Sequence, residues 1–528
     1  MAALAEAGPG GDPPPPPPPP PTDELPVIET RNSDFLEEIA LEPRASGPAF
    51  ALGDAIDLWN GNLHLSLPAS PAYSLDGRLS LGMSLGYNSK KARKDRFVAG
   101  TQLFHTVMGR SWVGLGWTGH LGRIFKMPVY RGDGEYGERS YFETPTGGLY
   151  KFKPNLNKAH PGLNIQYFPD QTCTNWGPPP WCDKVPDSPD CAEDVCLDWN
   201  VKPGYYQVTY PDGTVVKLDH YVPATKVDPG GWIENYDLAG WYATSIADVF
   251  GNTIQIHYSD DAAAIPGAID RVWAGDTNAP DAELTMTLWT QADVDAGACP
   301  VAARGHLREV HAVGFEGQEV VYKFSYGQKT LVDQQRGELR TAGEQKVIDV
   351  AVLKQVDVGP SGGSPLLSTH YRYGVVPSVG FSSASFKALL GRITSPTGAV
   401  AEYEYGTSVL GTREVSGGLE DREAIGVVRR VEFPDGLGDS GAPADEPHYT
   451  WSWERQFKAS ACSLSGKESN AITNSFLSSF PDGRETEAKF YGHPCGNNDP
   501  DWGSLGTVWK MTVETEPGFQ ELSCAPSS

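Results

Sequence analysis

Apolar and polar residues alternate in short runs along most of the chain, which is the period of β-strands with one buried face. In the run from Ile56 to Leu67, an Asn-Gly pair precedes leucines at positions 63, 65 and 67. This combination predicts a β-hairpin with one buried face. From Leu79 to Tyr87 every second residue is apolar, which predicts one further strand over residues 79–87.

Two short motifs recur along the chain. An aromatic-x-Tyr-Gly motif, predicted to end a strand, occurs at 324–327, 371–374 and 403–406, with a degraded copy at 490–492. A Pro-Asp-Gly or Pro-Thr-Gly motif, predicted to be a tight turn between two strands, occurs at 145–147, 211–213, 396–398, 434–436 and 481–483. Residues 246–258 form a variant with Asp248, Gly251 and Asn252 at the turn. Because the copies are irregularly spaced, they favour hairpins joined into one long curling sheet over a strict propeller or solenoid.

Composition supports an all-β fold. The chain has 528 residues, of which 59 are Gly and 44 are Pro, and so many turn-forming residues exclude a helical bundle or coiled coil. Hydrophobic residues make up 39%, enough for a sizeable core, which excludes a wholly disordered chain. The predicted fold class is therefore all-β, with many antiparallel hairpins in a long curled sheet.

The same patterns divide the chain into five parts. Residues 1–48 are predicted to be a disordered Pro-rich tail, with consecutive prolines at 13–21 and a short helix at 34–41. Residues 49–165 form an N-terminal hairpin region with a Gly-Trp segment, and residues 166–200 a Cys-rich insertion loop. Residues 201–495 form the repeat sheet, and residues 496–528 a C-terminal tail.

Charge narrows the classes of function. Lys and Arg number 42 against 67 Asp and Glu, giving a net charge of −25 that repels phosphate backbones, so no nucleic-acid partner is expected. No apolar run reaches the roughly 18 residues of a membrane helix, so no transmembrane segment is expected. The N-terminus also lacks the basic start and apolar core of a secretion signal.

Four of the eight cysteines cluster in the predicted insertion loop, namely Cys173, Cys182, Cys191 and Cys196. An even number with local clustering favours disulfides, and therefore a secreted or cell-surface protein. A zinc site and free thiols are the alternatives, although the cluster lacks histidine and the close Cys pairs of zinc sites. A misassigned start codon, a different export route or a partial chain would each reconcile secretion with the missing signal.

Four stretches together resemble the RHS/YD-repeat family in its amino-terminal region, including the shell subunits of insecticidal toxin complexes. They are residues 56–68, residues 85–89, the Gly-Trp segment at 113–124, and the recurring hairpins with aromatic-x-Tyr ends. The resemblance covers about residues 50–495. It implies a β-sheet wound into a hollow shell, often around a toxic C-terminal domain, in an exported or surface-exposed protein. The chain departs from the family in placing Gly, not Asp, after the repeat Tyr, and in stopping where members usually continue.

The resemblance also implies a candidate for self-cleavage. Many family members carry an aspartyl motif of the form P-x4-D-P-x-G-[L/W], and Pro223 is followed at matching positions by Asp228, Pro229, Gly231 and Trp232. Repeats continue well beyond this motif, which favours a solvated turn over a cleavage site.

These features predict a non-enzymatic structural protein that needs no cofactor or metal. It would enclose or present a toxin or effector polypeptide, either a protein partner or a downstream segment. The alternative is a cell-surface module that binds glycans through exposed Trp, for which Trp451 and Trp453 are candidates because they share one strand face. A carbohydrate-active enzyme is the third hypothesis, although no pair of carboxylates is singled out.

Overall fold

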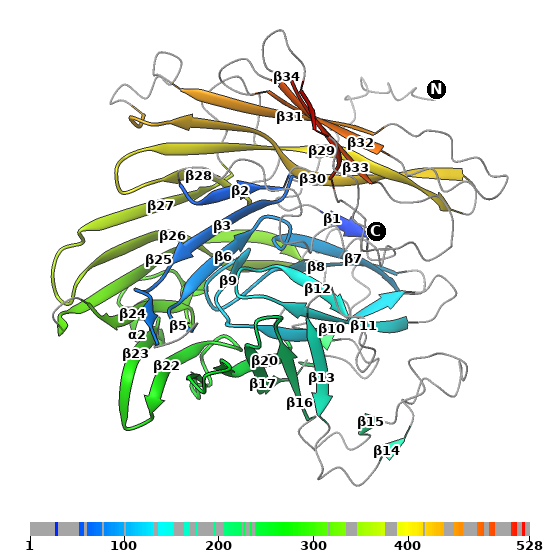
Figure 1. Cartoon of the computed structure of the whole chain (residues 1–528). Helices are drawn as coiled ribbons and strands as arrows, with labels where there is room; N and C mark the ends of the chain where they lie inside the picture. Colours follow the sequence, from blue (N-terminus) through cyan, green and yellow to red (C-terminus); the bar gives the residue numbers. More distant parts are fainter. Residues whose placement is uncertain are drawn as a thin grey trace, which may run out of the picture.

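The structure is a computed structural model in which nearly all regular structure is β, as predicted (Figure 1). Everything below concerns the residues that the structure describes. These are 27–29, 52–57, 61–75, 79–99, 102–130, 136–152, 163–168, 176–177, 195–196, 204–223, 225–226, 233–234, 238–314, 317–333, 346–374, 388–415, 418–437, 448–457, 473–479, 485–491, 508–514 and 520–522. The predicted Pro-rich tail and its helix at 34–41 lie outside them, apart from residues 27–29.

One sheet of 22 strands dominates the fold, and its strands follow one another in chain order. All pairs whose register is defined in this sheet are antiparallel, so hairpin follows hairpin. The first strand, β10, pairs with both β11 and β20, so the beginning of the sheet returns on itself before the later strands continue. The strands are β10 (Arg123–Tyr130), β11 (Tyr136–Glu143), β12 (Leu149–Phe152), β13 (Asn164–Phe168), β16 (Tyr205–Thr209), β17 (Val215–Val222), β20 (Gly240–Ala247), β21 (Thr253–Tyr258), β22 (Ile269–Asp276), β23 (Ala279–Leu288), β24 (Leu307–Val313), β25 (Glu319–Asp333), β26 (Lys346–Pro360), β27 (Leu367–Tyr373), β28 (Leu390–Thr394), β29 (Val400–Val415), β30 (Gly418–Phe433), β31 (Tyr449–Phe457), β32 (Thr473–Ser479), β33 (Glu485–Tyr491), β34 (Val508–Glu514) and β35 (Gln520–Leu522).

The connections between neighbouring strands of this sheet differ in length. Tight turns join β16 to β17, β20 to β21 and β28 to β29, at the predicted motifs 211–213, 248–252 and 396–398. Longer connections join β13 to β16 and β23 to β24, the second holding the short helices α2 (Gln291–Asp295) and η3 (Val301–Ala303). Because neighbouring strands are antiparallel, these three turns lie along one edge of the sheet and these two longer connections along the other.

Smaller sheets complete the fold. β2 and β3 form the hairpin predicted from the Asn-Gly pair, and together with β6 and β9 they make a four-stranded sheet. The single strand predicted over 79–87 is wrong, because the chain splits there into β5 and β6, which belong to different sheets. The split coincides with Met83, whose N–H bonds to the Ser70 hydroxyl instead of continuing a ladder. The strands are β1 (Val27–Glu29), β2 (Asp54–Ile56), β3 (Leu63–Pro68), β4 (Tyr73–Ser74), β5 (Ser80–Leu81), β6 (Ser84–Asn88), β7 (Arg93–Ala99), β8 (Gln102–Met108), β9 (Trp117–Thr118), β14 (Trp176–Gly177), β15 (Val195–Cys196), β18 (Thr225–Lys226) and β19 (Ile233–Glu234).

Residues 52–122, here called the amino-terminal segment, lie against one face of the large sheet, where Figure 1 shows blue strands β2, β3 and β6 beside green and yellow strands. Backbone hydrogen bonds join the segment to the sheet along its length. Leu307 donates to Trp112, Leu115 donates to Ala351, and Val427 donates to Gly61. The main hydrophobic core includes both parts, so the segment supplies one layer of the core and the sheet the other.

The aromatic-x-Tyr-Gly motifs supply the sheet side of this contact. The Trp117 indole N–H donates to the Tyr373 hydroxyl over 2.8 Å, and its ring centroid lies 5.3 Å from that of Tyr371. The Tyr87 hydroxyl accepts from the N–H of Leu390 over 3.0 Å. The motif aromatics therefore bind the amino-terminal segment to the sheet.

The motifs were predicted to end strands, and this is confirmed only at Tyr373, the last residue of β27. At the other two sites it is wrong, because β25 and β29 continue past Gly327 and Gly406. At each motif the register shifts immediately before the Tyr, and a shift also precedes Phe490 of the degraded copy. The motif thus marks a β-bulge, a feature that bends a strand and increases the twist of a sheet.

Gly240 is the residue whose replacement should disturb the start of the sheet most directly. It has φ +138°, and a Cβ added there would lie 2.2 Å from the carbonyl oxygen of Ile124, where β20 meets β10. Gly240→Ala should lower the free energy of unfolding by about 3 kcal/mol, because backbone strain and overpacking add. Gly251→Ala is the matched control, since its φ is +92° but nothing lies within 4 Å. Denaturant unfolding of both variants checks this, and equal losses would contradict the steric argument.

Candidate functional site: a buried charge cluster

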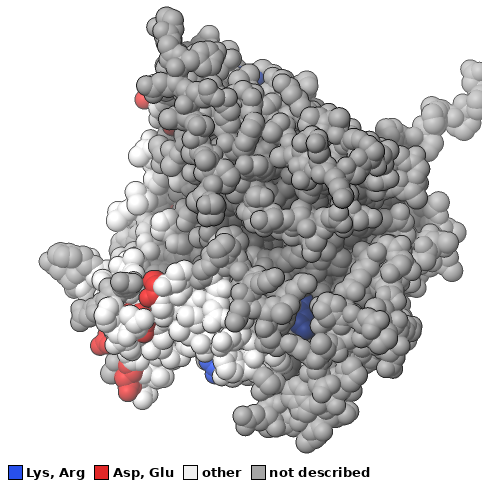
Figure 2. Space-filling view, turned by 45° about the vertical axis from the view of Figure 1, so that its right-hand side comes forward, with Lys and Arg blue, Asp and Glu red and all other residues white. Residues whose placement is uncertain are grey.

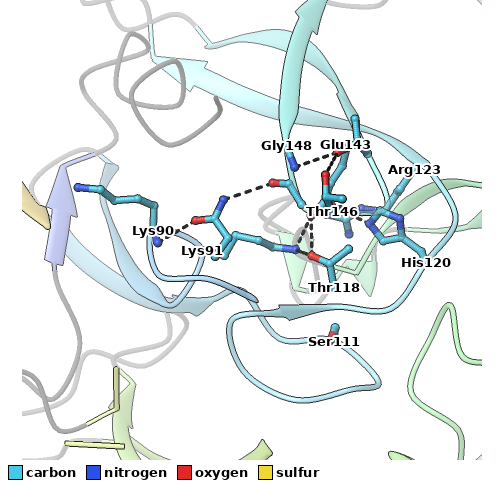
Figure 3. A network of polar contacts seen from close by, with 12 residues as sticks. Lys90, Lys91, Ser111, Thr118, His120, Arg123, Glu143, Thr146 and Gly148 are labelled. Atoms are coloured by element: carbon cyan, nitrogen blue, oxygen red, sulfur yellow. Dashed lines mark hydrogen bonds and ion pairs between the residues drawn. The ribbon is translucent and has the colours of Figure 1, made fainter. Parts of the chain in front are cut away.

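Among the described residues, several buried charged and polar side chains lie together in a cluster around Glu143 (Figure 3). Glu143 ends β11 at the Pro-Thr-Gly turn that leads to β12, and its side chain is fully buried. The turn is closed by hydrogen bonds from the backbone N–H groups of Gly147 and Gly148 to Thr144. The turn predicted at 145–147 therefore presents a carboxylate to the interior.

Cations from two other elements meet this carboxylate. Lys91, which follows β6, forms an ion pair with Oε1 of Glu143 and also donates to the Thr118 hydroxyl over 2.6 Å. Arg123, the first residue of β10, places Nε at 3.0 Å and Nη2 at 2.8 Å from Oε2. The same guanidinium lies 4.5 Å from the ring centroid of Phe125. The residue after β6 and the consecutive strands β10 and β11 thus converge on one buried carboxylate.

His120 completes the cluster as a neutral imidazole. Its Nδ1 accepts from the backbone N–H of Gly122 over 3.1 Å, so the proton belongs on Nε2, which lies 3.1 Å from Oε2 of Glu143. In this tautomer Nε2–H lies beside the carboxylate without carrying a charge, although it makes no hydrogen bond there. Burial lowers the pKa of His120, and Glu143 only partly offsets this effect.

The carboxylate stays ionised. Burial alone would raise the pKa of Glu143, but Lys91, Arg123 and His120 together hold it well below its usual range. A carboxylate that is ionised and saturated with donors is a poor general acid or base, because proton exchange would break several contacts at once. The geometry supports a structural role, in which the cluster joins the amino-terminal segment to the start of the large sheet.

A second buried cluster joins the same segment to β30. The Arg430 guanidinium donates from Nε to Oδ2 of Asp54 over 2.7 Å and from Nη2 to Oδ1 over 3.2 Å. Both side chains of this pair are fully buried. The Tyr403 hydroxyl donates to the same carboxylate over 2.7 Å, and Arg430 also lies 4.9 Å from the ring centroid of Trp451. This pair again links residues far apart in the chain.

The cysteines predicted to form disulfides fall mostly outside the described residues. Cys173, Cys182 and Cys191 lie there, and of Cys196 only the backbone is described, in β15 opposite Trp176. Among described side chains, Cys299 is a free thiol. The disulfides and their zinc and thiol alternatives therefore stay predictions.

The candidate self-cleavage motif is likewise outside the described part. Asp228, Pro229, Gly231 and Trp232 lie in the connection between β17 and β20, and only Pro223 of the motif is described. Cleavage at this motif stays untested.

The tryptophans proposed for glycan binding belong to the core. Trp453 is 4% exposed, and Trp451 is half-buried against the core and Arg430. Trp112, Trp117 and Trp241 are also buried. Core packing, the ordinary role of Trp, is therefore what the structure shows for these five side chains.

Sequence reasoning missed Glu143 and the Asp54–Arg430 pair. The only local sign at Glu143 is its place directly before a predicted turn, which does not distinguish a buried carboxylate from an exposed one. Asp54 and Arg430 are 376 positions apart, and no local pattern relates them. Within the described ranges, no group of three or more His, Cys, Asp or Glu residues is arranged to hold a metal ion.

The surface seen in Figure 2 agrees with the acidic composition. In the described part of this face, red Asp and Glu gather at the lower left, and blue Lys and Arg are sparse. No helix among the described residues is both long and apolar enough to cross a membrane.

The fold and its buried clusters define an all-β protein built around one long antiparallel sheet. No protein-family model matches the chain, and no curated protein matches it. Among solved structures it is similar to the N-terminal domain of the effector protein SpvB from Salmonella typhimurium strain LT2. The identity is 13% and the TM-score 0.22, over 69% of this chain and 98% of that domain.

Two further solved structures are similar to the chain. The structure of TcdB2-TccC3-Cdc42 matches at 14% identity and TM-score 0.23, over 89% of this chain, and that of TcdB2-TccC3-TEV at 14% and 0.23, over 92%. The chain spans only 19% and 20% of those two chains. At TM-scores this low the likeness carries no argument about activity, and the resemblance to RHS/YD repeats stays a prediction.

Proposed function

We propose that the chain is a non-enzymatic structural protein that encloses or presents another polypeptide at or outside the cell surface. The observation that carries the proposal is the sheet of 22 strands in chain order, together with the bulges at its repeated motifs. A sheet that adds one hairpin after another, with a bulge at each recurring motif, is suited to form the wall of an enclosure. The order of RHS/YD-like motifs along the chain supports the same function.

The buried clusters also support a structural role. Glu143 and the Asp54–Arg430 pair each bind the amino-terminal segment to the sheet, and their charged groups are enclosed. Such groups fix one arrangement of the elements, because a displaced partner would leave a charge buried and unpaired. The two buried charge clusters of the described residues thus stabilise the contact between the amino-terminal segment and the large sheet.

The test uses the native product from its source cells. Its intact mass is measured with and without reduction, and the purified material is then treated with protease. An enclosed polypeptide, either a second chain or a continuation of this one, should resist protease at concentrations that digest the same polypeptide on its own. A mass shift on reduction would additionally support disulfides and secretion.

Two results would overturn this function. A species of 57.0 kDa without any protected polypeptide, and with binding to a glycan panel, would favour the carbohydrate-binding module. Turnover of a glycoside that is lost when a single carboxylate is neutralised would favour an enzyme. Burial of Trp451 and Trp453 gives the glycan hypothesis no support from those two residues.

A further inference from the structure

His64 in β3 contacts an amide whose orientation is fixed by its other partners. Oδ1 of Asn62 accepts from the Ser89 hydroxyl over 3.1 Å and from the backbone N–H of Lys90 over 3.3 Å. Because both partners are donors there, the NH2 group of Asn62 must point the other way, toward Nε2 of His64 at 2.9 Å. Nε2 must therefore accept this bond, which only a neutral imidazole can do.

Protonation would reverse the polarity of this contact. An imidazolium carries N–H on both ring nitrogens, so Nε2–H would face the N–H of the Asn62 amide. The amide cannot rotate to present its oxygen without losing the bonds from Ser89 and Lys90. Ser89 is itself tied to β3, because its hydroxyl accepts from the N–H of Leu63. The charged form of His64 is thus incompatible with the arrangement of residues 61–64 and 88–90.

That arrangement is what holds β30. The Lys90 ammonium donates to the carbonyl oxygen of Ile425, and the N–H of Val427 donates to the carbonyl oxygen of Gly61 over 2.8 Å. These contacts join the turn after β2 and the turn after β6 to one strand of the large sheet. We call the contacts of Gly61 and Lys90 with β30 the latch.

His64 is half-buried in β3, and this burial lowers its pKa to about 4, from an ordinary 6.5. Burial alone explains why the pKa of His64 is lowered, without a contribution from a charged neighbour. Charged groups on the elements packed against β3 are Asp54, Asp57, Lys90, Lys91 and Arg430, of which Asp54 binds Arg430 and Lys91 binds Glu143.

We propose that His64 makes the latch sensitive to acid, so that its protonation opens the contacts of Gly61 and Lys90 with β30, while the Asp54–Arg430 pair still joins that strand to the amino-terminal segment. When the latch opens, the half-buried imidazole becomes more exposed to water and Asn62 turns away from Ser89 and Lys90. The proton comes from solvent, and no covalent bond changes. The proposal does not depend on whether the chain encloses a polypeptide.

The direction of the pH effect follows from linkage. In the closed latch His64 binds a proton less readily than in the open latch, so the open form takes up protons as the pH falls below about 6.5. The latch is fully stable above that pH and is progressively lost as the pH approaches 4. At pH 5 the ratio of open to closed latch should rise on the order of tenfold.

Hydrogen exchange of the full chain tests this inference, because the N–H of Val427 bonds directly to Gly61. Exchange is followed by mass spectrometry between pH 7.5 and 5, corrected for the intrinsic rate at each pH. Protection at Val427 should fall on the order of tenfold, while β21 to β24 keep theirs. His64→Gln, whose side-chain oxygen can accept from Asn62 but cannot be protonated, should abolish the fall.

Asn62→Asp provides a second, independent variant. A carboxylate would still accept from Ser89 and Lys90 and would offer His64 an acceptor, so the charged imidazole would be favoured and the latch would stay closed at pH 5. His257→Gln is the matched control, since that ring is half-exposed and paired with Asp270, and it should leave the fall unchanged.

The inference is overturned if wild-type protection at Val427 does not change with pH, or if protection is lost across all strands together. It is also overturned if a folded His64→Gln variant loses protection as the wild type does. Should His64→Gln not fold at pH 7.5, Asn62→Asp decides, and an unaltered fall in that variant would refute the latch.

Discussion

Glu143→Gln is expected to lower the free energy of unfolding by about 3–5 kcal/mol, because it leaves two buried cations without their carboxylate. Lys91 and Arg123 both bind Glu143, whose side chain has no exposed surface. The amide oxygen of Gln can accept one of these bonds, but its NH2 group would face a second donor. Denaturant unfolding followed by circular dichroism measures the loss.

Glu283→Gln is the control for this prediction. Glu283 also pairs with an arginine, Arg271, but the two side chains are 33% and 30% exposed. An exposed pair of this kind contributes about 1 kcal/mol or less, so the control should change stability little. If Glu143→Gln and Glu283→Gln lowered the free energy of unfolding equally, burial would not explain the contribution of the Glu143 ion pairs to stability.

The features that the sequence predicted well are those that one short stretch determines. The turns at 211–213, 248–252 and 396–398 depend on local residues, and each joins the two strands expected on either side. Gly213 and Gly398 have φ values of +86° and +91°, which a residue without a side chain adopts freely. Hairpins can therefore be recognised from residues within a few positions of one another.

The features that could not be predicted depend on contacts between distant parts of the chain. The aromatic-x-Tyr-Gly motif was expected to end strands, since Gly weakens a strand interior. In β25 and β29 the neighbouring strand continues beside the motif, so the ladder resumes after a bulge and the strand does not end. Whether a partner continues is a property of the neighbouring strand, and the motif carries no information about it.

Burial of charge is a second property beyond the reach of local patterns. Arg430 lies in a strand with Arg429 and Glu432 close by, a composition that favours an exposed face. Arg430 is nevertheless fully buried, because the amino-terminal segment covers it and supplies Asp54. The sequence shows the apolar alternation of that segment, but not which strands of the sheet it will cover.

Arg430→Met is the second variant with a large expected effect, a loss of about 3–5 kcal/mol in the free energy of unfolding. Met keeps much of the apolar volume of the side chain and its contact with Trp451. It cannot pair with the carboxylate of Asp54, which is 1% exposed and would lose its charged partner. The Tyr403 hydroxyl would remain as a neutral donor to it. Denaturant unfolding again measures the effect, and Arg271→Met, which removes a half-exposed arginine that also stacks on a tryptophan, is the control.

The double variant Asp54→Asn/Arg430→Met separates two causes of this loss. If most of the cost comes from an unpaired buried charge, neutralising Asp54 should recover a large part of it, because the remaining amide needs only hydrogen bonds. If the cost comes from lost packing around Trp451, the double variant should be no more stable than Arg430→Met. Recovery would show that the ion pair fixes where the amino-terminal segment docks on β30 and is not a general source of stability, since a buried charge penalises every docking position that leaves it unpaired.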